Sequence, residues 1–386
     1  MKIVIVGDTH FGVNNGLGRK KAEGGHTRLD DFSETFNKII DYCIENDVDA
    51  LVQTGDLFEA RTPTQEDIMA VDKAFRRLSA NGITTVAIMG NHDYSKVQTS
   101  LKSTLRLLSS RNYDKVRLYE DPQIISVGTS YDPVNLMLLP YRDKKYYPGS
   151  TNEEASIEFS KEIEELLETR DKTAPTLAVG HNFFWEGSYK KYSGEIMIKP
   201  DVFKDCVGIL MGHEHNFKIL KEEPFVCYTG SMDRQNFGDR NKNYFFIEYD
   251  SILQKFTKIP TPTIDLHDEI VDLQKSDHES ILKDLKKKVN EYDLTDSIVR
   301  FTFLIPEKLN EFVKIPSVEK LIYSRGAKFV SKIIKQPIKE RFVRNLDINK
   351  NLTDYQKFKK FIDDQGYDDA DKTSILKFAK EIIEEA

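Results

Sequence analysis

The chain is poor in cysteine and in long apolar runs, and each shortage excludes a class of protein. Its three cysteines, Cys43, Cys206 and Cys227, are an odd number without framework spacing, which excludes a disulfide-stapled domain and predicts reduced, buried thiols. No apolar stretch approaches the ~20 residues that cross a bilayer, so we expect no membrane span. The opening MKIVIVGDTH is too short for a signal peptide. We therefore expect a cytoplasmic protein.

An excess of positive charge is also missing. The chain has 56 Lys and Arg residues against 63 Asp and Glu residues, which gives a formal net charge of −7. This argues against a protein that binds duplex nucleic acid by charge alone, because such affinity comes mainly from Lys and Arg neutralising phosphates. Short basic and aromatic stretches remain candidates for a nucleic-acid surface, and the alternative for each is a solvated loop. The candidates are Arg19, Lys20, Lys21, Trp185, Lys190 and Lys191, together with Arg142, Lys144 and Lys145.

Length and composition set the expected organisation. The 386 residues, 39% hydrophobic and 31% charged, predict a globular chain of two or three domains. Residues 1–260 alternate short apolar runs with amphipathic segments, which we expect to be helices at 29–46 and 64–82. This alternation predicts an α/β fold with the helices outside the sheets. Pro260 and Pro262 mark the end of the region.

Five apolar runs of this region end in a glycine that is followed directly by a residue able to bind a metal ion. The residues that these motifs supply are Asp8, His10, Asp56, Asn91, His92, Asp93, His181, His213 and His215. Glycine lets the backbone turn sharply and approach a ligand closely. The polar residues should then lie just past strand ends, where open α/β sheets build their sites. Five of the eight histidines of the chain belong to these motifs, which indicates metal chemistry.

The types of ligand narrow the kind of metal site. Two Asp, one Asn and several His residues without Cys favour Mn²⁺, Fe²⁺ or Zn²⁺ in an open site that keeps water. Seven ligands are more than one tetrahedral ion takes. They suit two ions roughly 3.5–4 Å apart that share one carboxylate. We expect Asp56 to be the shared ligand, because it stands alone at its strand end.

The order D-x-H, G-D, G-N-H-D, G-H, G-H-x-H resembles the signature of the calcineurin-like metallophosphoesterases. Two more blocks, Gly-Asp-Leu-Phe at 55–58 and Gly-Ser-x-x-Arg-x-x-Phe-Gly at 230–238, resemble the SbcD-type nuclease subunits of DNA double-strand-break repair and recombination, cellular or phage. The specific motifs cover about 1–260, and beyond them the resemblance rests on layout. It implies a four-layer β-sandwich flanked by helices, a small α+β capping domain, a C-terminal helical hairpin, and a bacterial or phage-infected cytoplasm.

The resemblance also implies a role for each motif residue. One ion would be held by Asp8, His10, Asp56 and His215, and the other by Asp56, Asn91, His181 and His213. His92 would lie over the scissile phosphate and help to protonate the leaving oxygen, and Asp93 would orient the imidazole of His92. The implied reaction is two-metal phosphodiester hydrolysis with Mn²⁺, or alternatively with Mg²⁺, Fe²⁺ or Zn²⁺.

Three domains are expected: a nuclease domain at 1–260, a capping domain that selects DNA at 264–345, and a helical tail at 346–386. The second should contain strands at 297–306 and 327–337 around a helix at 317–326. The tail should form two helices with an apolar face made of Tyr355, Phe358, Phe361, Ile362, Ile375, Phe378 and Ile382. A hairpin this short is expected to need another surface, either its own domain or a partner protein.

For the partner, the resemblance implies an SbcC-like coiled-coil ATPase. It also implies double-stranded DNA ends and single-stranded DNA as substrates, and a homodimer as the assembly.

Two alternative functions from other classes stay open. One is a metallophosphoesterase that acts on small phosphodiesters or phosphoproteins, and the other is a non-catalytic scaffold. The remaining histidines, His26, His267 and His278, are predicted to be solvated surface residues.

Overall fold

The computed structural model describes the chain except for residues 23, 95–102, 148–150, 185–194, 339–351, 364, 366 and 385–386. The nucleic-acid candidates Trp185, Lys190 and Lys191 therefore lie outside the described residues. By packing, the chain divides into two units. The first contains Met1–Glu269, Asp293–Arg300 and Ile322–Lys332, and the second contains Ile270–Tyr292, Phe301–Leu321 and Ile333–Ala386. The three domains expected from the sequence stay a prediction.

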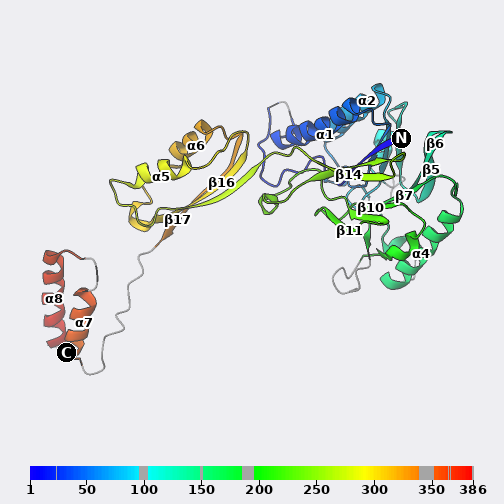
Figure 1. Cartoon of the computed structure of the whole chain (residues 1–386). Helices are drawn as coiled ribbons and strands as arrows, with labels where there is room; N and C mark the ends of the chain where they lie inside the picture. Colours follow the sequence, from blue (N-terminus) through cyan, green and yellow to red (C-terminus); the bar gives the residue numbers. More distant parts are fainter. Residues whose placement is uncertain are drawn as a thin grey trace. The chain divides into compact units, whose positions relative to one another are not determined.

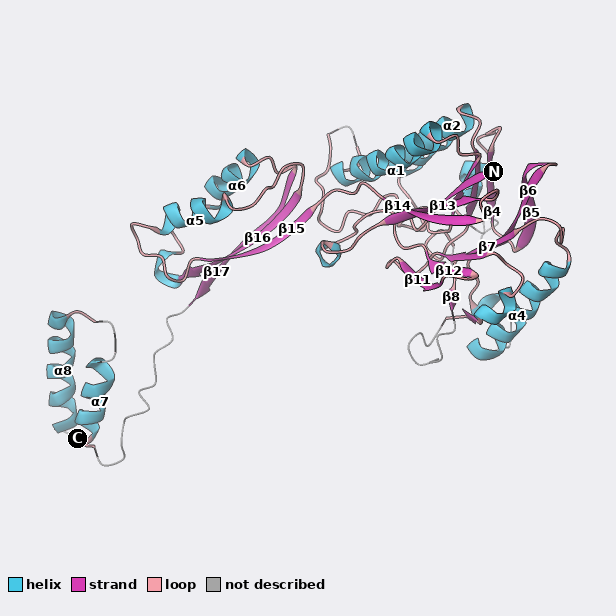
Figure 2. Ribbon diagram, in the orientation of Figure 1, coloured by secondary structure: helices cyan, strands magenta, loops and turns pink. Residues whose placement is uncertain are grey.

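Two six-stranded sheets form the centre of the first unit (Figure 2). The first sheet, in spatial order, consists of β14 (Lys255–Pro260), β13 (Phe245–Asp250), β1 (Lys2–Val6), β2 (Ala50–Gln53), β3 (Thr84–Ile88) and β4 (Val116–Tyr119). The second consists of β11 (Lys218–Lys221), β12 (Phe225–Tyr228), β10 (Gly208–Met211), β7 (Thr176–Gly180), β6 (Asp132–Leu139) and β5 (Gln123–Thr129). Strands β1 to β4 are parallel, as are β6, β7, β10 and β12, so their carboxyl ends meet at one edge of each sheet.

Helices cover the outer face of each sheet, which confirms the predicted layered α/β fold (Figure 1). The helices of the first unit are α1 (Thr27–Glu45), α2 (Gln65–Ala80), α3 (Leu105–Ser109) and α4 (Asn152–Glu168). Val4 of β1 packs with Phe36 of α1 in the outer core that α2 also lines. Its neighbour Ile3 points the other way, into the core between the two sheets, because successive strand residues face opposite sides. Met137 of the second sheet packs with Phe159 of α4.

The observed ends of α2 agree with the sequence prediction, whereas the cap of α1 was not predicted. The hydroxyl of Thr64 and the carboxylate of Asp67 form a reciprocal cap at the start of α2, and Asn81 ends the helix as expected. His26, predicted to be a solvated surface residue, is only partly exposed. Its imidazole caps α1, because Nδ1 accepts a hydrogen bond from the N–H of Leu29 at 3.1 Å.

A third sheet contains β15 (Leu266–Asp272), β16 (Ile298–Pro306) and β17 (Phe329–Ile338) in this order. The helices α5 (Ile281–Val289) and α6 (Ile315–Ser324) belong to the same region of the sequence. The structure thus confirms the two strands and the helix predicted here and adds β15 and α5. The shorter elements are β8 (Phe183–Phe184), β9 (Met197–Ile198), η1 (Lys144–Tyr146), η3 (Pro200–Phe203), η4 (Phe237–Asp239) and η5 (Glu307–Leu309).

The tail forms the predicted helical hairpin from α7 (Asp354–Asp363) and α8 (Asp369–Glu384). An apolar groove of about 510 Å³ runs along it, and its lining is Phe358, Ser374, Ile375, Phe378, Ala379, Ile382 and Ile383. Phe378 is 66% exposed and Ile382 is 53% exposed, whereas Ile362 is 3% exposed. The hairpin therefore buries only part of its apolar face.

Among the described helices, none has both the length and the apolar character needed to cross a membrane.

Candidate metal centre

The five glycine motifs follow β1, β2, β3, β7 and β10, which are all parallel strands near the middle of the two sheets. Three of the glycines lie where any side chain would collide with the centre. A Cβ atom at Gly90 would be 2.1 Å from the amide nitrogen of Asp56, and one at Gly212 would be 2.5 Å from Oδ1 of Asp8. A Cβ atom at Gly55 would be 2.3 Å from Nδ1 of His181. The close approach inferred from the glycines is therefore what brings the ligands together.

Replacing Gly90 with alanine is expected to lower the free energy of unfolding by about 1–3 kcal/mol, the usual cost of overpacking, and to weaken Mn²⁺ binding. The cost is steric, because Gly90 is not in the left-handed region and the new methyl group meets the backbone of Asp56. Chemical denaturation and calorimetric Mn²⁺ titration would measure both effects. Gly82→Ala is the control, since a Cβ there meets nothing within 4 Å and adds only backbone strain. Unchanged Mn²⁺ affinity in Gly90→Ala would contradict the prediction.

The first ligand group contains Asp8, His10, Asp56 and His215, whose ligand atoms all lie within 4.8 Å of one another. Nε2 of His10 is 3.1 Å from Nε2 of His215 and 3.6 Å from Oδ2 of Asp56. Nε2 of His215 is 3.8 Å from Oδ2 of Asp8. This is the set expected for the first ion.

The second ligand group contains Asp56, His181 and His213, again within 4.8 Å of one another. The amide oxygen of Asn91 joins it, at 2.9 Å from Nε2 of His181 and 2.8 Å from Nδ1 of His213. Nε2 of His181 is also 3.3 Å from Oδ2 of Asp56. Asp56 is thus common to both groups, as expected for a carboxylate that two ions share.

The backbone at three of these ligands is in the left-handed region, with φ of 44° at His10, 53° at Asp56 and 80° at His213. Such conformations are uncommon outside glycine and concentrate at functional sites. Hydrogen bonds hold the backbone at His213 and orient the ring of His181. The N–H of His213 donates to Oδ2 of Asp8 at 3.0 Å, and Nδ1 of His181 lies 2.8 Å from the carbonyl of Thr54. The latter contact turns Nε2 of His181 toward the ligand groups.

Burial and charge make this set a suitable receptor for divalent cations. Burial raises the pKa of the Asp8 carboxyl to about 7. Burial would also raise the pKa of Asp56, but the imidazoles of His181 and His10 outweigh it and hold that pKa far below its usual range. Burial lowers the pKa of His213 to about 3 and that of His215 to about 4, so both imidazoles are neutral near pH 7.

One buried atom supports the same conclusion. Nε2 of His213 has no hydrogen-bond partner among the described residues, although the ring is largely buried. Buried polar atoms in native proteins normally have a partner. Imidazoles, an amide oxygen and carboxylates are the donor types that divalent transition metals accept. The residues present therefore fit a pair of divalent cations.

His92 lies beside the first group, and its ring centroid is 4.9 Å from that of His10. The backbone N–H of His92 donates to Oδ1 of Asp56 at 2.7 Å, and its ring Nδ1 is 2.6 Å from the main-chain carbonyl of Glu59. The side chain of His92 is 35% exposed, so the ring is accessible to a substrate. The structure thus places the predicted catalytic imidazole at the mouth of the ligand groups.

The predicted role of Asp93 as the residue that orients His92 is wrong. The Asp93 carboxylate is fully buried, and it accepts hydrogen bonds from the N–H groups of Leu57, Phe58 and Gly90 at 3.0–3.1 Å. It therefore ties the loop after β2 to the loop after β3. Burial raises its pKa to about 6. Asp93 shapes the centre through the backbone, because a carboxylate facing three amides is fully engaged.

Glu59 is a residue of the centre that the sequence motifs did not reveal. Its Oε2 is 2.9 Å from Nδ1 of His10 and 3.9 Å from Nδ1 of His92. Its position directly after Gly-Asp-Leu-Phe was the only signal in the sequence. An acidic residue at that place is not distinguishable from a surface residue without the fold.

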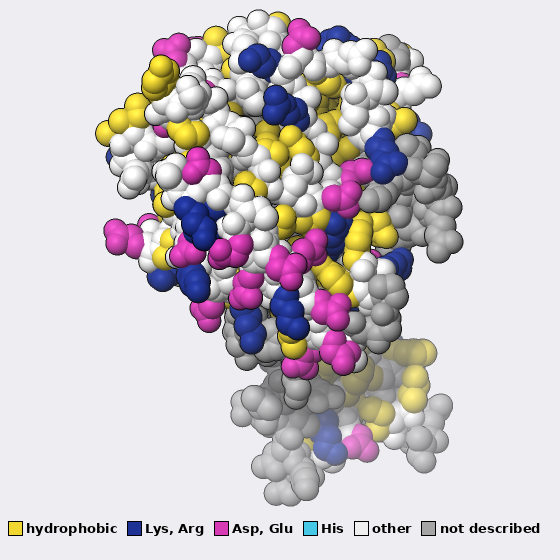
Figure 3. All heavy atoms as spheres, turned by 90° about the vertical axis from the view of Figure 1, so that its right-hand side faces the viewer, with side chains coloured by type: hydrophobic (Ala, Val, Ile, Leu, Met, Phe, Trp, Pro, Cys, Tyr) yellow, Lys and Arg dark blue, Asp and Glu magenta, His cyan; other side chains and the backbone are white. Residues whose placement is uncertain are grey.

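The described nucleic-acid candidates are not part of the ligand groups. Arg19 and Lys20 are exposed, and Lys21 pairs with Asp30 of α1 at 2.7 Å. Arg142 was a candidate for a nucleic-acid surface, with a solvated loop as the alternative, and both predictions are wrong. Its side chain is buried, pairs with Asp121 at 3.2 Å and stacks on a tyrosine ring. On the face that Figure 3 shows, acidic and basic side chains are interspersed, in line with the net negative charge.

The segment 230–238 connects the loop after β1, which contains Asp8, to helix α1. Met232 donates its N–H to the carbonyl of Asp8 at 2.9 Å. The next residue, Asp233, pairs with the fully buried Arg28 at 3.1 Å, and Arg28 also pairs with Asp31 at 3.2 Å. Breaking a buried pair of this kind usually costs several kcal/mol. The block is therefore a structural support of the centre.

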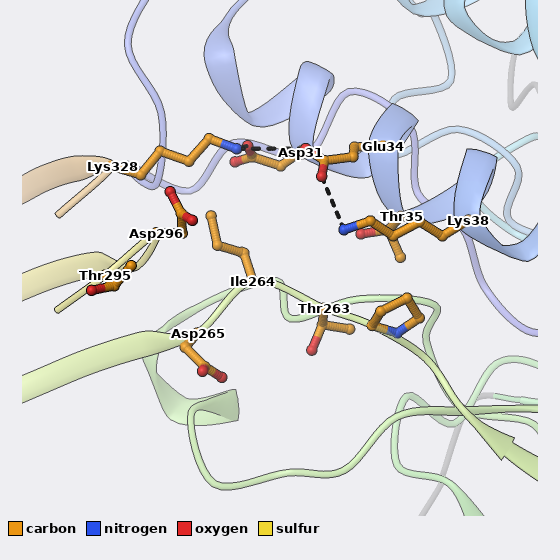
Figure 4. Close-up of a pocket in the computed structure, with 11 residues that line it drawn as sticks. Asp31, Glu34, Thr35, Lys38, Thr263, Ile264, Asp265, Thr295, Asp296 and Lys328 are labelled. Atoms are coloured by element: carbon orange, nitrogen blue, oxygen red, sulfur yellow. Dashed lines mark ion pairs between the residues drawn. The ribbon is translucent and has the colours of Figure 1, made fainter. Parts of the chain in front are cut away.

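A separate polar cavity of about 320 Å³ lies beside α1 and contains none of the ligand residues (Figure 4). Its lysines are already paired. Lys328 is 2.7 Å from Asp31, and Lys38 is 2.9 Å from Glu34. Asp296 also points into the cavity. The cavity is thus a net acidic space, with four carboxylates against two lysines, and it is separate from the metal centre.

Comparison with known proteins gives one family match and several relatives. Residues 1–217 match the family model described as calcineurin-like phosphoesterase. The "DNA double-strand break repair protein Mre11" of Methanosarcina acetivorans is 25% identical over 349 residues, which cover 88% of this chain and 51% of that protein. The protein of the same name from Haloferax volcanii is 24% identical over 303 residues, which cover 77% of this chain and 60% of that protein.

The chain spans about half the length of the curated relatives that it matches. Among solved structures, a dimetal phosphatase from Danio rerio is a distant likeness, with a TM-score of 0.38 and 10% identity. That likeness covers 68% of this chain and 99% of the phosphatase.

Proposed function

The chain belongs to the calcineurin-like phosphoesterase family, and from this premise we propose that it is a Mn²⁺-dependent DNA nuclease subunit that works with a coiled-coil ATPase on DNA ends. The observation that carries the proposal is the pair of ligand groups that share Asp56, with His92 beside them. The names of the curated relatives support DNA as the substrate. Exonuclease action, endonuclease action or both fit this centre.

In the proposal, Asp8, His10, Asp56 and His215 hold one ion, and Asp56, Asn91, His181 and His213 hold the other. The donor types favour Mn²⁺, with Fe²⁺, Zn²⁺ and Mg²⁺ as alternatives. When bound, two such ions supply an activated water molecule and positive charge for the phosphoryl oxygens. The chain itself contributes the buried, preorganised donor set, which is held by the Thr54 and Asp93 contacts to the surrounding loops.

His92 has the proton-transfer role. Its Nδ1 faces the carbonyl of Glu59, so its proton lies on that side and Nε2 is the atom left for the substrate. To act as the acid, the ring must be the imidazolium, in which Nε2 carries a second proton; that proton passes to the leaving oxygen of the scissile phosphodiester and leaves the neutral ring with its Nδ1 proton. Because the ring adjoins His10, this oxygen would be next to the first ligand group.

Cleavage of end-labelled duplex DNA tests the proposal most directly. The purified chain would be assayed with Mn²⁺, with chelator, and with a generic phosphodiester in parallel. The proposal expects DNA cleavage that needs Mn²⁺. Hydrolysis of the generic ester alone, both with and without the ATPase partner, would overturn DNA as the substrate.

The tail is proposed to dock on the coiled coil of the ATPase through its apolar groove, in the helix-in-groove manner. Deleting residues 346–386 is expected to abolish co-purification with the ATPase and to leave the basal nuclease rate unchanged. Phe378→Asp should do the same, because Phe378 is 66% exposed in the groove. The exposed Lys377→Asp is the matched control on the neighbouring position. Retained co-purification after the deletion would show that the docking surface lies elsewhere.

The homodimer stays a prediction, and light scattering can measure the oligomeric state of the purified chain.

A further inference from the structure

We infer that Glu59 is a positioning residue of the metal centre: its carboxylate orients the imidazole of His10, and its main-chain carbonyl orients that of His92. One residue would thus align a metal ligand and the proton donor together. The inference rests on the proposed function only for the role of His92. The part that concerns His10 depends on metal binding alone.

The main chain places Glu59 beside His10, independently of the Glu59 side chain. After β1 and β2 end, their loops continue to pair: the N–H of His10 donates to the carbonyl of Asp56, and the N–H of Phe11 donates to that of Leu57, each at 3.0 Å. The N–H of Glu59 then donates to the carbonyl of Phe11 at 3.0 Å. This ladder keeps the segment in place when the side chain at position 59 is changed.

The carboxylate determines which nitrogen of His10 is free to bind a metal ion. Its Oε2 lies 2.9 Å from Nδ1, an ion-pair distance at which the angle is not that of a hydrogen bond, so it is the negative charge of the carboxylate that favours a proton on Nδ1. The lone pair is then on Nε2, the atom that faces His215 at 3.1 Å. Carboxylates that support ligand histidines in this way typically change metal affinity 10–100-fold when they are removed.

The carbonyl of Glu59 does the equivalent for His92. The contact of 2.6 Å to Nδ1 leaves Nε2 as the atom directed at a substrate. A carbonyl oxygen belongs to the backbone, so substitutions at position 59 keep this contact. The two functions of Glu59 are therefore separable by mutation.

The same three residues, His10, Glu59 and His92, also have ligand atoms close enough to hold an ion of their own. The hydrogen bonding argues against a third ion. Nδ1 of His92 is engaged by the Glu59 carbonyl, and His10 would need to bind metal through both nitrogens at once. The stoichiometry of metal binding distinguishes the two arrangements.

The test is calorimetric Mn²⁺ titration of the full chain as Glu59→Ala, Glu59→Gln and wild type, with the exposed Glu165→Gln as a matched control. We expect two ions in every variant, a loss of about 10–100-fold in affinity for one ion in Glu59→Ala, and a smaller loss in Glu59→Gln, which keeps an oxygen acceptor. Unchanged affinity in Glu59→Ala would overturn the inference. So would a fall from three bound ions to two.

A second measurement separates positioning from proton transfer. At saturating Mn²⁺, Glu59→Ala is expected to recover to within a few-fold of the wild-type cleavage rate, whereas His92→Ala stays inactive. A Glu59→Ala variant that binds two ions normally and still fails to cleave would contradict the role assigned to the carboxylate. If the wild type cleaves no DNA, the proposed function fails, but the titration still decides the role of Glu59 at His10.

Discussion

Replacing Asp56 with asparagine is expected to weaken the binding of both metal ions at once and to lower the rate of DNA cleavage by roughly 10³–10⁵-fold. Asp56 is the one carboxylate that both ligand groups contain. Its ionised form, which His181 and His10 stabilise, is the negative charge that both ions would share. Loss of that charge therefore removes electrostatic stabilisation from two sites, whereas substitution of His215 or His213 affects one.

Asparagine is the suitable replacement because it changes the charge and little else. The backbone of Asp56 has φ of 53°, a conformation that asparagine tolerates better than most residues. The variant should therefore fold, which thermal unfolding without metal would confirm. In the wild type, Mn²⁺ should raise the melting temperature, since a ligand of the folded state stabilises it, and this rise should be largely lost in Asp56→Asn. The exposed Asp114→Asn is the matched control. Two ions bound at wild-type affinity in Asp56→Asn would show that Asp56 is not shared.

Replacing His92 with alanine is expected to leave both ions bound and to lower the cleavage rate by about 10²–10⁴-fold, the usual contribution of a positioned general acid. The side chain of His92 is not a member of either ligand group that shares Asp56, and its ring reaches the exposed mouth of the centre. Calorimetric Mn²⁺ titration and the end-labelled DNA assay measure the two quantities independently. The substrate KM should change less than kcat, because the interaction develops as the leaving oxygen takes up charge.

The outcome that would contradict this role is loss of an ion in His92→Ala, since it would make His92 a ligand. His267→Ala is the matched control, because His267 faces Glu269 at 3.7 Å and belongs to none of the ligand groups. Together with Asp56→Asn, the His92 variant separates metal binding from proton transfer. One change weakens the binding of the ions, and the other leaves them in place without the acid.

The predictions that the structure confirmed depend on short stretches of sequence. A buried strand that alternates its side chains between two cores, as Ile3 and Val4 do, needs apolar residues at every position. The glycine that follows determines where the chain turns, as Gly90 illustrates, and the next residue is then the one at the sheet edge. Helix α2 was predictable for the same reason, because its cap at Thr64 is a local pattern.

The predictions that failed all concerned the partner of a polar side chain. Asp93 was assigned to the neighbouring imidazole, but it bonds to backbone N–H groups of the loop after β2. His26 was assigned to solvent, but its ring caps the helix that begins at the next residue, by accepting a hydrogen bond from the N–H of Leu29. Arg142 was a candidate for a nucleic-acid surface or a solvated loop, but it is buried against Asp121 and a tyrosine ring. The partners of Asp93 and Arg142 lie in other loops and are chosen by packing, and the partner of His26 is a backbone N–H of its own helix; neither the charge nor the residue type indicates which.

The sequence by itself determined the strands, the sharp turns after them and the candidate metal-binding residues at their ends, because a strand, its glycine and the next candidate ligand are consecutive in the chain. Only the tertiary structure decided how the ligands divide into two groups around Asp56 and which carboxylate supports His10. The physical reason is that these contacts join separate loops. His10 and His215, for example, are 205 positions apart and 3.1 Å from each other, and the pairing of strands across two packed sheets sets that distance.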